Sequence, residues 1–212
     1  MTETVIPRVA AENLAEFCDV FCESGVFDRD ESETVLRAAA GLGLRPKIHA
    51  DEIHAIGGSQ LAGVLQAASA EHLIAAPDEG IRSLAEGGTV AVLLPATSFY
   101  LDKPFARARD MINAGVPVAV ATDFNPGSCP SLNIQFVMSL ACYKYRMKPE
   151  EVLTAVTLNA AAAIGRADRI GTLEPGKQGD LVIWDGPSLE HVFYRFGSDQ
   201  VKTVIKKGIR VK

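Results

Sequence analysis

The sequence predicts an α/β fold built from parallel βα units. Short apolar runs typical of strands alternate with amphipathic runs typical of helices as far as residue 164. Consecutive strand-like runs are about 20 to 30 residues apart, the separation that a crossover between parallel strands needs. Each strand-like run is almost continuously apolar, as expected for strands whose two faces are both covered. With 212 residues, 48% of them hydrophobic, the chain can bury a sizeable core.

Five strands are predicted, and polar or turn residues follow most of them. They cover residues 18–22, 44–49, 69–72, 89–94 and 116–121. The first is followed by Glu23-Ser24-Gly25, and Pro95 stops the fourth. The carboxyl ends of parallel strands are where α/β enzymes place their chemistry, so the residues just past these ends are candidates for a site.

Helices are predicted between and after the strands. They cover residues 7–16, 30–40, 59–67, 77–86, 104–114, 131–145 and 149–164. Asp30 opens an acidic first turn in the second helix, and Asp78 and Glu79 do the same in the fourth, which suits the helix dipole. Gly115 is a C-cap for the fifth helix.

From Arg169 the pattern changes to turns and short strands. Residues 170–185 indicate turns followed by a strand, and residues 191–196 and 201–211 alternate like hairpin strands. We therefore expect a partial (β/α) barrel over residues 1–165 and a β-rich segment over residues 166–212. A complete (β/α)₈ barrel has eight units and about 250 residues, and five units are counted here. A doubly wound sheet is the alternative, but Gly41-Leu-Gly43 precedes a strand and is no dinucleotide fingerprint.

Composition narrows the class of protein. The net charge of −5 with scattered basic residues argues against a nucleic-acid partner. The sequence has neither an apolar run of about 20 residues for a membrane helix nor a signal-peptide core at its start. Its four cysteines include no C-x-x-C pair, which excludes zinc-ribbon and thioredoxin motifs. A reduced, cytoplasmic location is expected.

Histidine and carboxylate residues follow three of the predicted strands. His49 and His72 end two neighbouring strands, and Asp123 follows the fifth. A single histidine is more often structural than a ligand, but the repetition at a second strand end favours a site. An ionised aspartate in that position needs a metal, an arginine or a helix N-terminus as partner, although an Asx turn into Asn125 is the simpler alternative. Imidazole and carboxylate together suit Zn²⁺ or Fe²⁺.

Two further groups of polar residues complete the candidate site. Glu52 lies three residues after His49 and is a plausible proton acceptor beside activated water, or else a solvated glutamate at a helix start. The turn Asn125-Pro-Gly127-Ser128 is expected to offer backbone N–H groups to an anion, although it is also ordinary turn chemistry. Asp51 is predicted to be a cap or to face outward, His54 to be a surface residue and His191 to be structural.

Several of these segments together resemble the amidohydrolase superfamily, and within it the imidazolonepropionases of histidine degradation. The resemblance extends from about residue 6 to residue 211 and rests on five motifs: His49-Ala-Asp-Glu52 with Gly57-Gly58-Ser-Gln-Leu-Ala62, Ala68-Ser-Ala-Glu-His72-Leu73, Thr122-Asp123-Phe-Asn125-Pro-Gly127-Ser128, Thr157-Leu-Asn159-Ala160-Ala161, and Ile170-Gly-Thr-Leu-Glu-Pro-Gly176-Lys-Gln-Gly-Asp180-Leu-Val182. The last motif is general to cyclic amidohydrolases, whereas the first and third are more particular.

The resemblance implies a (β/α)₈ barrel with a composite β domain and one divalent metal, zinc or iron. It implies hydrolysis of the ring amide of 4-imidazolone-5-propanoate to N-formimidoyl-L-glutamate by a homodimer. His49 and Asp123 would be metal ligands, Glu52 would contact substrate and carry a proton, and His72 would hydrogen-bond the reacting water or carbonyl. The propionate end would be held by three turn residues, Asn125, Gly127 and Ser128.

The family's His-x-His metal pair has no counterpart among the four histidines of this chain, at 49, 54, 72 and 191. The resemblance therefore implies the carboxyl-terminal portion of such an enzyme, inactive or nearly so by itself. Two other hypotheses remain open. The chain is another cyclic amidohydrolase or deaminase, which a substrate panel would reveal, or it is a non-catalytic half-barrel that binds a partner.

Overall fold

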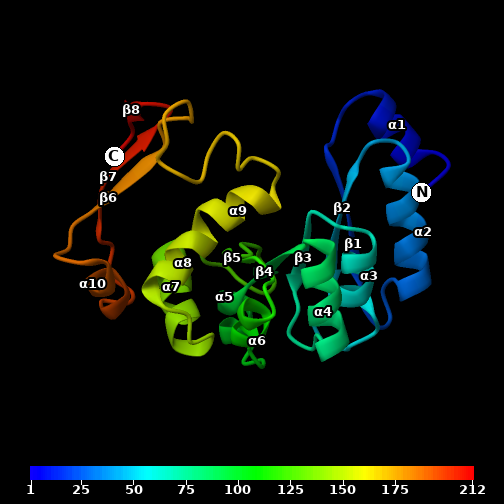
Figure 1. The fold of residues 1–212 in the computed structure, drawn as a ribbon, viewed down its shortest axis with the longest axis horizontal. Coiled ribbons are helices and arrows are strands. Elements are labelled where there is room, and N and C mark those ends of the chain that lie inside the picture. Colours follow the sequence, from blue (N-terminus) through cyan, green and yellow to red (C-terminus); the bar gives the residue numbers. More distant parts are fainter. The chain divides into compact units, whose positions relative to one another are not determined.

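The computed structural model describes all residues from Met1 to Lys212 and divides into two compact units (Figure 1). Unit 1 comprises Met1–Leu93 and Ala106–Val118, and unit 2 comprises Leu94–Phe105 and Ala119–Lys212. The boundary expected between residues 165 and 166 does not coincide with this division and stays a prediction.

Strands and helices alternate through unit 1, as predicted. The strands are β1 (Phe17–Cys22), β2 (Arg45–Ala50), β3 (Ser69–His72) and β4 (Val90–Leu93), and β5 (Val118–Val120) starts at the last residue of the unit. The helices are α1 (Val5–Ala11), α2 (Arg29–Ala40), α3 (Gly58–Val64), α4 (Asp78–Gly87) and α6 (Ala108–Asn113). The sheet order is β1-β2-β3-β4-β5, and the pairs from β1 to β4 are parallel. The predicted parallel α/β sheet is confirmed.

Burial on both faces explains why β4 is wholly apolar and why the polar residues of β3 need partners. Every residue of β3 and of β4 is buried, so both faces of each strand are covered. Helix α2 packs against β1 and β2, and α3 packs against β2. Asp28 caps α2 by accepting a hydrogen bond from the N–H of Glu31 at 2.8 Å, and the Glu31 carboxylate accepts one from the Asp28 N–H at 3.0 Å.

Helices α3 and α4 lie side by side and touch through glycines (Figure 1). A Cβ added to Gly63 would lie 2.1 Å from the carbonyl oxygen of Ser83. One added to Gly87 would lie 2.3 Å from the carbonyl oxygen of Gly63, and one added to Gly80 would lie 2.0 Å from Oγ of Ser59. The two backbones are therefore as close as their atoms allow, and Thr89 Oγ1 adds a hydrogen bond to the Ala62 carbonyl oxygen at 3.2 Å.

Unit 2 combines helices with a small antiparallel sheet. Its helices are α5 (Pro95–Tyr100), α7 (Ile134–Lys144), α8 (Pro149–Val156), α9 (Leu158–Ala163) and α10 (Leu189–Tyr194). Its sheet contains β6 (Leu181–Trp184), β7 (Val201–Lys206) and β8 (Ile209–Arg210), in that order. The rings of Phe99 and Phe136 join α5 to α7 edge to face at 5.3 Å between centroids.

The helices between residues 94 and 164 differ from the prediction at three places. Helix α5 is not predicted from the sequence, because Pro95 follows an apolar run and indicates the end of a strand, whereas proline is also favoured in the first turn of a helix. The helix predicted over residues 149–164 is two helices, separated at Thr157, where φ is −121° and ψ is −88°. The helix predicted over residues 104–114 begins only at Ala108.

The hairpin strand predicted over residues 191–196 was also wrong, because α10 occupies most of this segment. Ser188 starts the helix by accepting a hydrogen bond from the N–H of His191 at 3.3 Å. The apolar pair Val192 and Phe193 is buried, and the Phe193 carbonyl oxygen accepts a hydrogen bond from Tyr143 Oη at 2.8 Å. Packing on α7 thus favours a helix where the short apolar run alone did not distinguish helix from strand.

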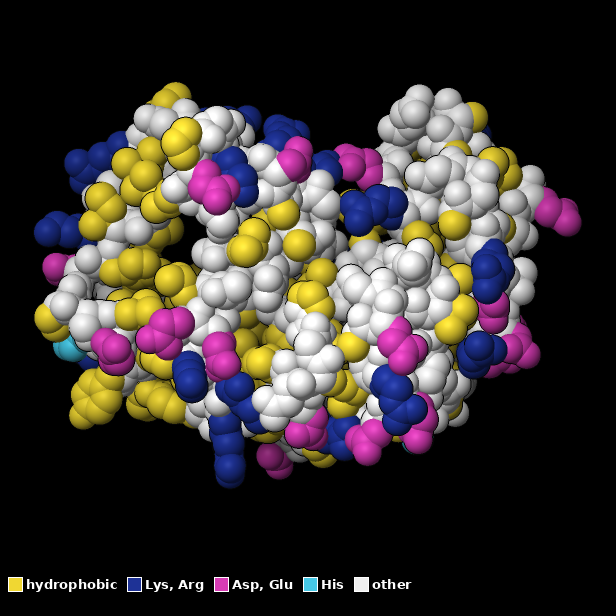
Figure 2. All heavy atoms as spheres, viewed as in Figure 1, with side chains coloured by type: hydrophobic (Ala, Val, Ile, Leu, Met, Phe, Trp, Pro, Cys, Tyr) yellow, Lys and Arg dark blue, Asp and Glu magenta, His cyan; other side chains and the backbone are white.

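Hydrophobic side chains remain uncovered over the last segment of unit 2. Figure 2 shows them gathered where α10 and the β6–β8 sheet lie, and the exposed residues there include Val182, Ile183, Tyr194, Phe196, Ile209 and Val211. None of the helices in the structure is both long enough and apolar enough to span a membrane.

Candidate metal and proton-transfer site

The register of the parallel strands brings polar side chains onto one face of the sheet in unit 1. Asp19 on β1 is paired with Lys47 on β2, and Lys47 with Ser69 on β3. Two residues further along, His49 is paired with Glu71. Because side chains two apart on a strand share a face, these five residues form two adjacent rows on the same side of the sheet.

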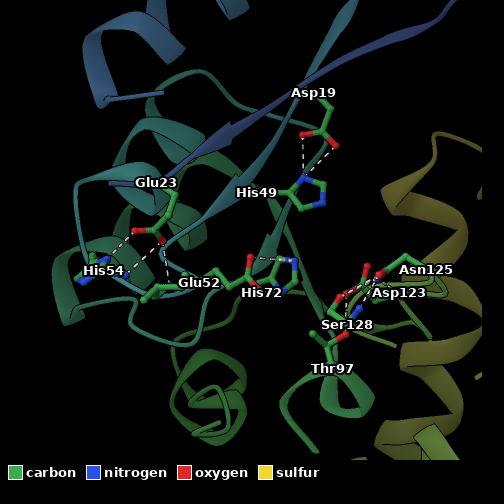
Figure 3. A network of polar contacts seen from close by, with 11 residues as sticks. Asp19, Glu23, His49, Glu52, His54, His72, Thr97, Asp123, Asn125 and Ser128 are labelled. Atoms are coloured by element: carbon green, nitrogen blue, oxygen red, sulfur yellow. Dashed lines mark hydrogen bonds and ion pairs between the residues drawn. The ribbon is translucent and has the colours of Figure 1, made fainter. Parts of the chain in front are cut away.

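His49 is held by a carboxylate from the neighbouring strand. Its Nδ1 lies 3.1 Å from Oδ1 and 3.1 Å from Oδ2 of Asp19 (Figure 3). The two side chains are about one third exposed, at 35% for His49 and 36% for Asp19. The ring of His72 lies 5.3 Å from that of His49, centroid to centroid. The imidazole of His49 is therefore oriented by Asp19 on one side and has a second imidazole nearby.

A buried ion pair lies beside this histidine. Lys47 Nζ lies 2.8 Å from Oε1 of Glu71, and Ser69 Oγ donates to the same oxygen at 2.5 Å. Lys47 also hydrogen-bonds Ser69 Oγ. The second oxygen of Glu71, Oε2, is buried without a hydrogen-bond partner. An unpartnered buried oxygen is unfavourable, so the ammonium of Lys47 is the principal compensation for this carboxylate.

The donors of this region are of the types that bind a divalent metal. One ligand atom from each of Asp19, His49 and Glu71 can be chosen so that all three lie within 4.8 Å of one another. Imidazole nitrogen and carboxylate oxygen are ligands that Zn²⁺ and other first-row metals accept. The sequence motifs indicate His49 but neither acid. The available signal is a charged residue inside a strand, at Asp19 within the apolar run Phe-Cys-Asp-Val-Phe-Cys and at Glu71 within Ser-Ala-Glu-His.

The predicted pair Glu52 and His72 does come together. Oε2 of Glu52 lies 3.5 Å from Nε2 of His72 (Figure 3). His72 is only 5% exposed and has a φ of +70°, and the next residue, Leu73, has a φ of +58°. Side chains other than glycine rarely adopt this left-handed region, so the end of β3 is strained in the conformation that points His72 toward Glu52.

The segment that carries Glu52 is anchored on both sides. Asp51 is fully buried, with a φ of +48°, and accepts hydrogen bonds from the N–H groups of Gly58 at 3.3 Å and Ser59 at 3.1 Å, at the start of α3. The prediction of a cap for Asp51 is confirmed, and that of an outward-facing residue is wrong. A buried carboxylate is stable there because the N-terminus of a helix supplies unpaired N–H donors.

Glu23, just past β1, holds the other side of this segment (Figure 3). Oε2 of Glu23 accepts from the N–H of Ile53 at 2.9 Å and of His54 at 3.2 Å, and Oε1 lies 2.8 Å from Nδ1 of His54. Burial by itself would raise the pKa of Glu23, but the N–H donors of Ile53 and Ser24 and the His54 ring outweigh it and lower that pKa. His54 is a surface residue, as predicted, and also a partner of this buried acid.

The depressed pKa of Glu23 predicts a pH-dependent contribution to stability. Glu23→Gln is expected to lower the free energy of unfolding by about 2 kcal/mol at neutral pH, the worth of hydrogen bonds to a charged acceptor. The pKa is lowered on folding, so this contribution is present above the ordinary value of 4.5 and is lost as pH falls through the folded-state pKa. Urea denaturation of wild type and variant over descending pH measures it. Glu86→Gln, at an exposed glutamate of α4, is the matched control. A wild-type advantage that did not shrink on acidification would contradict the assignment.

The other predicted site residues lie in unit 2. Asp123 has a φ of +54°, and its Oδ2 accepts a hydrogen bond from Thr97 Oγ1 at 2.6 Å (Figure 3). Asn125 Nδ2 donates to the Asp123 carbonyl oxygen at 2.8 Å, and Asn125 Oδ1 accepts from the N–H of Gly127 at 2.9 Å and of Ser128 at 2.7 Å. The two N–H groups predicted to bind an anion are thus satisfied by the Asn125 side chain, which would have to release them.

The sequence profile of the amidohydrolase family matches residues 26–211. The chain belongs to the amidohydrolase family, and its parallel sheet is part of the (β/α)₈ barrel of that family, as predicted. Among curated relatives, it is 54% identical over 202 residues to an imidazolonepropionase of Caldanaerobacter subterraneus subsp. tengcongensis, a match that covers 95% of this chain and 49% of the relative. It is 53% identical over 207 residues to an imidazolonepropionase of Alkaliphilus oremlandii, covering 97% of this chain and 49% of the relative. The chain spans about half the length of the curated relatives it matches.

Solved structures agree on the fold. An adenosine deaminase from Xanthomonas campestris with bound zinc matches with a TM-score of 0.75 and 25% identity, over 87% of this chain and 49% of that one. The atrazine chlorohydrolase TrzN of Arthrobacter aurescens, complexed with zinc, matches with a TM-score of 0.78 and 18% identity, over 99% of this chain and 55% of that one.

Proposed function

We propose that this chain is a portion of an imidazolonepropionase and takes part in the metal-dependent hydrolysis of 4-imidazolone-5-propanoate to N-formimidoyl-L-glutamate. The observation that carries the proposal is the meeting of His49, Glu52 and His72 at the ends of β2 and β3. Relatives more than 50% identical to the chain are imidazolonepropionases, and they support the choice of substrate.

His49 and Asp123 are the proposed metal ligands, and zinc or iron is the proposed ion. A divalent metal, when bound, supplies Lewis-acid polarisation of the ring carbonyl and activation of water. The imidazole of His49 is held by Asp19 in one orientation, as expected for a histidine that binds a metal. The aspartate is held by Thr97 and by the turn that Asn125 organises.

Glu52 and His72 are the proposed proton-handling pair. The 3.5 Å between Oε2 of Glu52 and Nε2 of His72 is close to hydrogen-bond distance, so one proton can be shared between them. Glu52 takes a proton from the attacking water as the water oxygen bonds to the carbonyl carbon of the ring. The bond between that carbon and the ring nitrogen then breaks, and the same proton passes to the leaving nitrogen. His72 donates a hydrogen bond to the oxygen on which negative charge develops.

Asn125, Gly127 and Ser128 are the proposed contacts of the propionate arm. They can bind a carboxylate if Asn125 Oδ1 yields the two N–H groups it now accepts from. A cytoplasmic location, a small-molecule substrate and a homodimer in the full enzyme belong to the same proposal, together with the absence of nucleic-acid and membrane partners.

The experiment combines binding with catalysis. N-Formimidoyl-L-glutamate titrated into the zinc-loaded chain should shift the imidazole NMR signals of His49 and His72 and leave those of His191 unchanged. Whatever hydrolysis of 4-imidazolone-5-propanoate the chain retains by itself should fall about 100-fold in Glu52→Gln, because a positioned acid–base group is worth at least that factor. Glu79→Gln, at an exposed glutamate in the first turn of α4, should leave the rate unchanged.

Two results would overturn the proposal. One is a chain that neither binds the product nor hydrolyses the substrate with zinc or iron present. The other is a preference, in a panel of imidazolone, dihydropyrimidine and guanine-type rings, for a ring without a propionate arm. That preference would instead support another cyclic amidohydrolase or deaminase.

A further inference from the structure

We propose that Asp19 is a positioning residue that fixes the tautomer of His49 and thereby selects Nε2 as its ligand nitrogen. The inference rests on the proposed function, because it assigns His49 to a metal. It adds a residue of β1 that the family motifs quoted above do not include.

The geometry supports a hydrogen bond in one direction. A carboxylate at neutral pH only accepts hydrogen bonds, so an imidazole nitrogen 3.1 Å from both oxygens of Asp19 must carry the proton. With the proton on Nδ1, a neutral His49 presents its lone pair at Nε2. Asp19 also makes the ring a better donor to a metal, since a carboxylate partner raises the basicity of the ligating nitrogen.

The neighbouring row argues against the alternative, in which Asp19, His49 and Glu71 jointly hold an ion through Nδ1. Lys47 is paired with Asp19 in the strand register and lies 2.8 Å from Glu71. Its side chain is only 18% exposed, so its charge is weakly screened. A cation between Asp19 and Glu71 would be repelled by the ammonium of Lys47. A cation bound at Nε2 of His49 would not need either of these two carboxylates as a ligand.

The test reads the tautomer directly, by long-range ¹H–¹⁵N NMR on the metal-free chain at neutral pH. Wild-type His49 should be the Nδ1–H tautomer, and zinc should then shift Nε2 rather than Nδ1. In Asp19→Ala the preference for Nδ1–H should be lost, and zinc affinity should fall about 10- to 100-fold, the usual effect of removing such a partner. Asp19→Asn keeps an acceptor oxygen and should therefore retain part of the preference for Nδ1–H and part of the zinc affinity. Asp30→Ala, at an exposed aspartate in the first turn of α2, is the matched control and should match wild type.

The outcomes separate this inference from the proposed function. An Nδ1–H tautomer that Asp19→Ala abolishes supports the positioning role, even if the chain binds no zinc, in which case the metal role of His49 fails. An Nε2–H tautomer in the wild type overturns the inference. Zinc that shifts Nδ1 also overturns it, in favour of an ion shared with Asp19. Denaturation curves of Asp19→Ala that match wild type would show that the change in tautomer is not a folding defect.

Discussion

Replacing His49 with alanine is expected to weaken the binding of Zn²⁺ to this chain about 100-fold. Apparent zinc binding energies for four-ligand protein sites are about 10–16 kcal/mol, so one ligand accounts for about 3 kcal/mol, or roughly a factor of 100. His49 is the only proposed ligand supplied by unit 1. It is also the residue that Asp19 and the ring of His72 both approach.

Competition with a chromophoric chelator measures this affinity, and His191→Ala is the matched control. His191 lies on α10 in unit 2 and has no proposed role at the metal. Its removal should leave the affinity within a factor of about three, which is less than 1 kcal/mol. Equal losses in the two variants would mean that zinc binds histidines nonspecifically, and the assignment of His49 would then be wrong.

Replacing Gly63 with alanine is expected to destabilise unit 1 by about 3 kcal/mol or more. Alanine is the better helix former by about 1 kcal/mol, so propensity alone predicts a gain. The new methyl group would lie 2.1 Å from the carbonyl oxygen of Ser83 and 2.3 Å from its carbonyl carbon. These are backbone atoms that no rotamer change can move aside. Helices α3 and α4 would have to separate, and overpacking of this kind exceeds the helix preference.

Gly41→Ala is the matched control for this substitution. Its Cβ would meet the carbonyl oxygens of Arg37 and Ala38 at 3.5 and 3.6 Å, which is ordinary contact, and its φ is −61°. The same change should therefore be neutral or slightly stabilising. Chemical denaturation followed by circular dichroism compares the two variants. A Gly63→Ala chain whose unfolding free energy lies within about 0.5 kcal/mol of wild type would show that the helices can move apart freely.

The sheet could be predicted from the sequence because burial on both faces leaves a plain signal. Runs such as Val90–Leu93 are wholly apolar and are bounded by turn residues, which a helix of ordinary length would not show. The prediction was wrong where a short apolar run fits either state. Residues 192 and 193 became part of a helix because Ser188 caps it and α7 covers it, and neither fact is local to the run.

The sequence predicts the histidines of the candidate site, but it predicts only some of the acidic residues. His49, Glu52 and His72 stand at strand ends, where position along the chain suffices to bring them together. Asp19 and Glu71 lie within strands, and their meeting depends on the register of β1, β2 and β3, which sequence spacing does not reveal. The hydrogen bonds of Asn125 to Gly127 and Ser128 depend on a side-chain rotamer, which the sequence does not predict either.

The left-handed backbone at Asp51, His72 and Asp123 has a consequence for protein engineering. Glycine relieves a positive φ at no steric cost, but at Asp51 and Asp123 it would also remove carboxylates that accept hydrogen bonds from Gly58, Ser59 and Thr97. At His72 it would remove an imidazole of the proposed proton-handling pair. A gain in thermal stability at His72 therefore competes with retention of the chemistry, and stabilising substitutions should be sought elsewhere in the molecule.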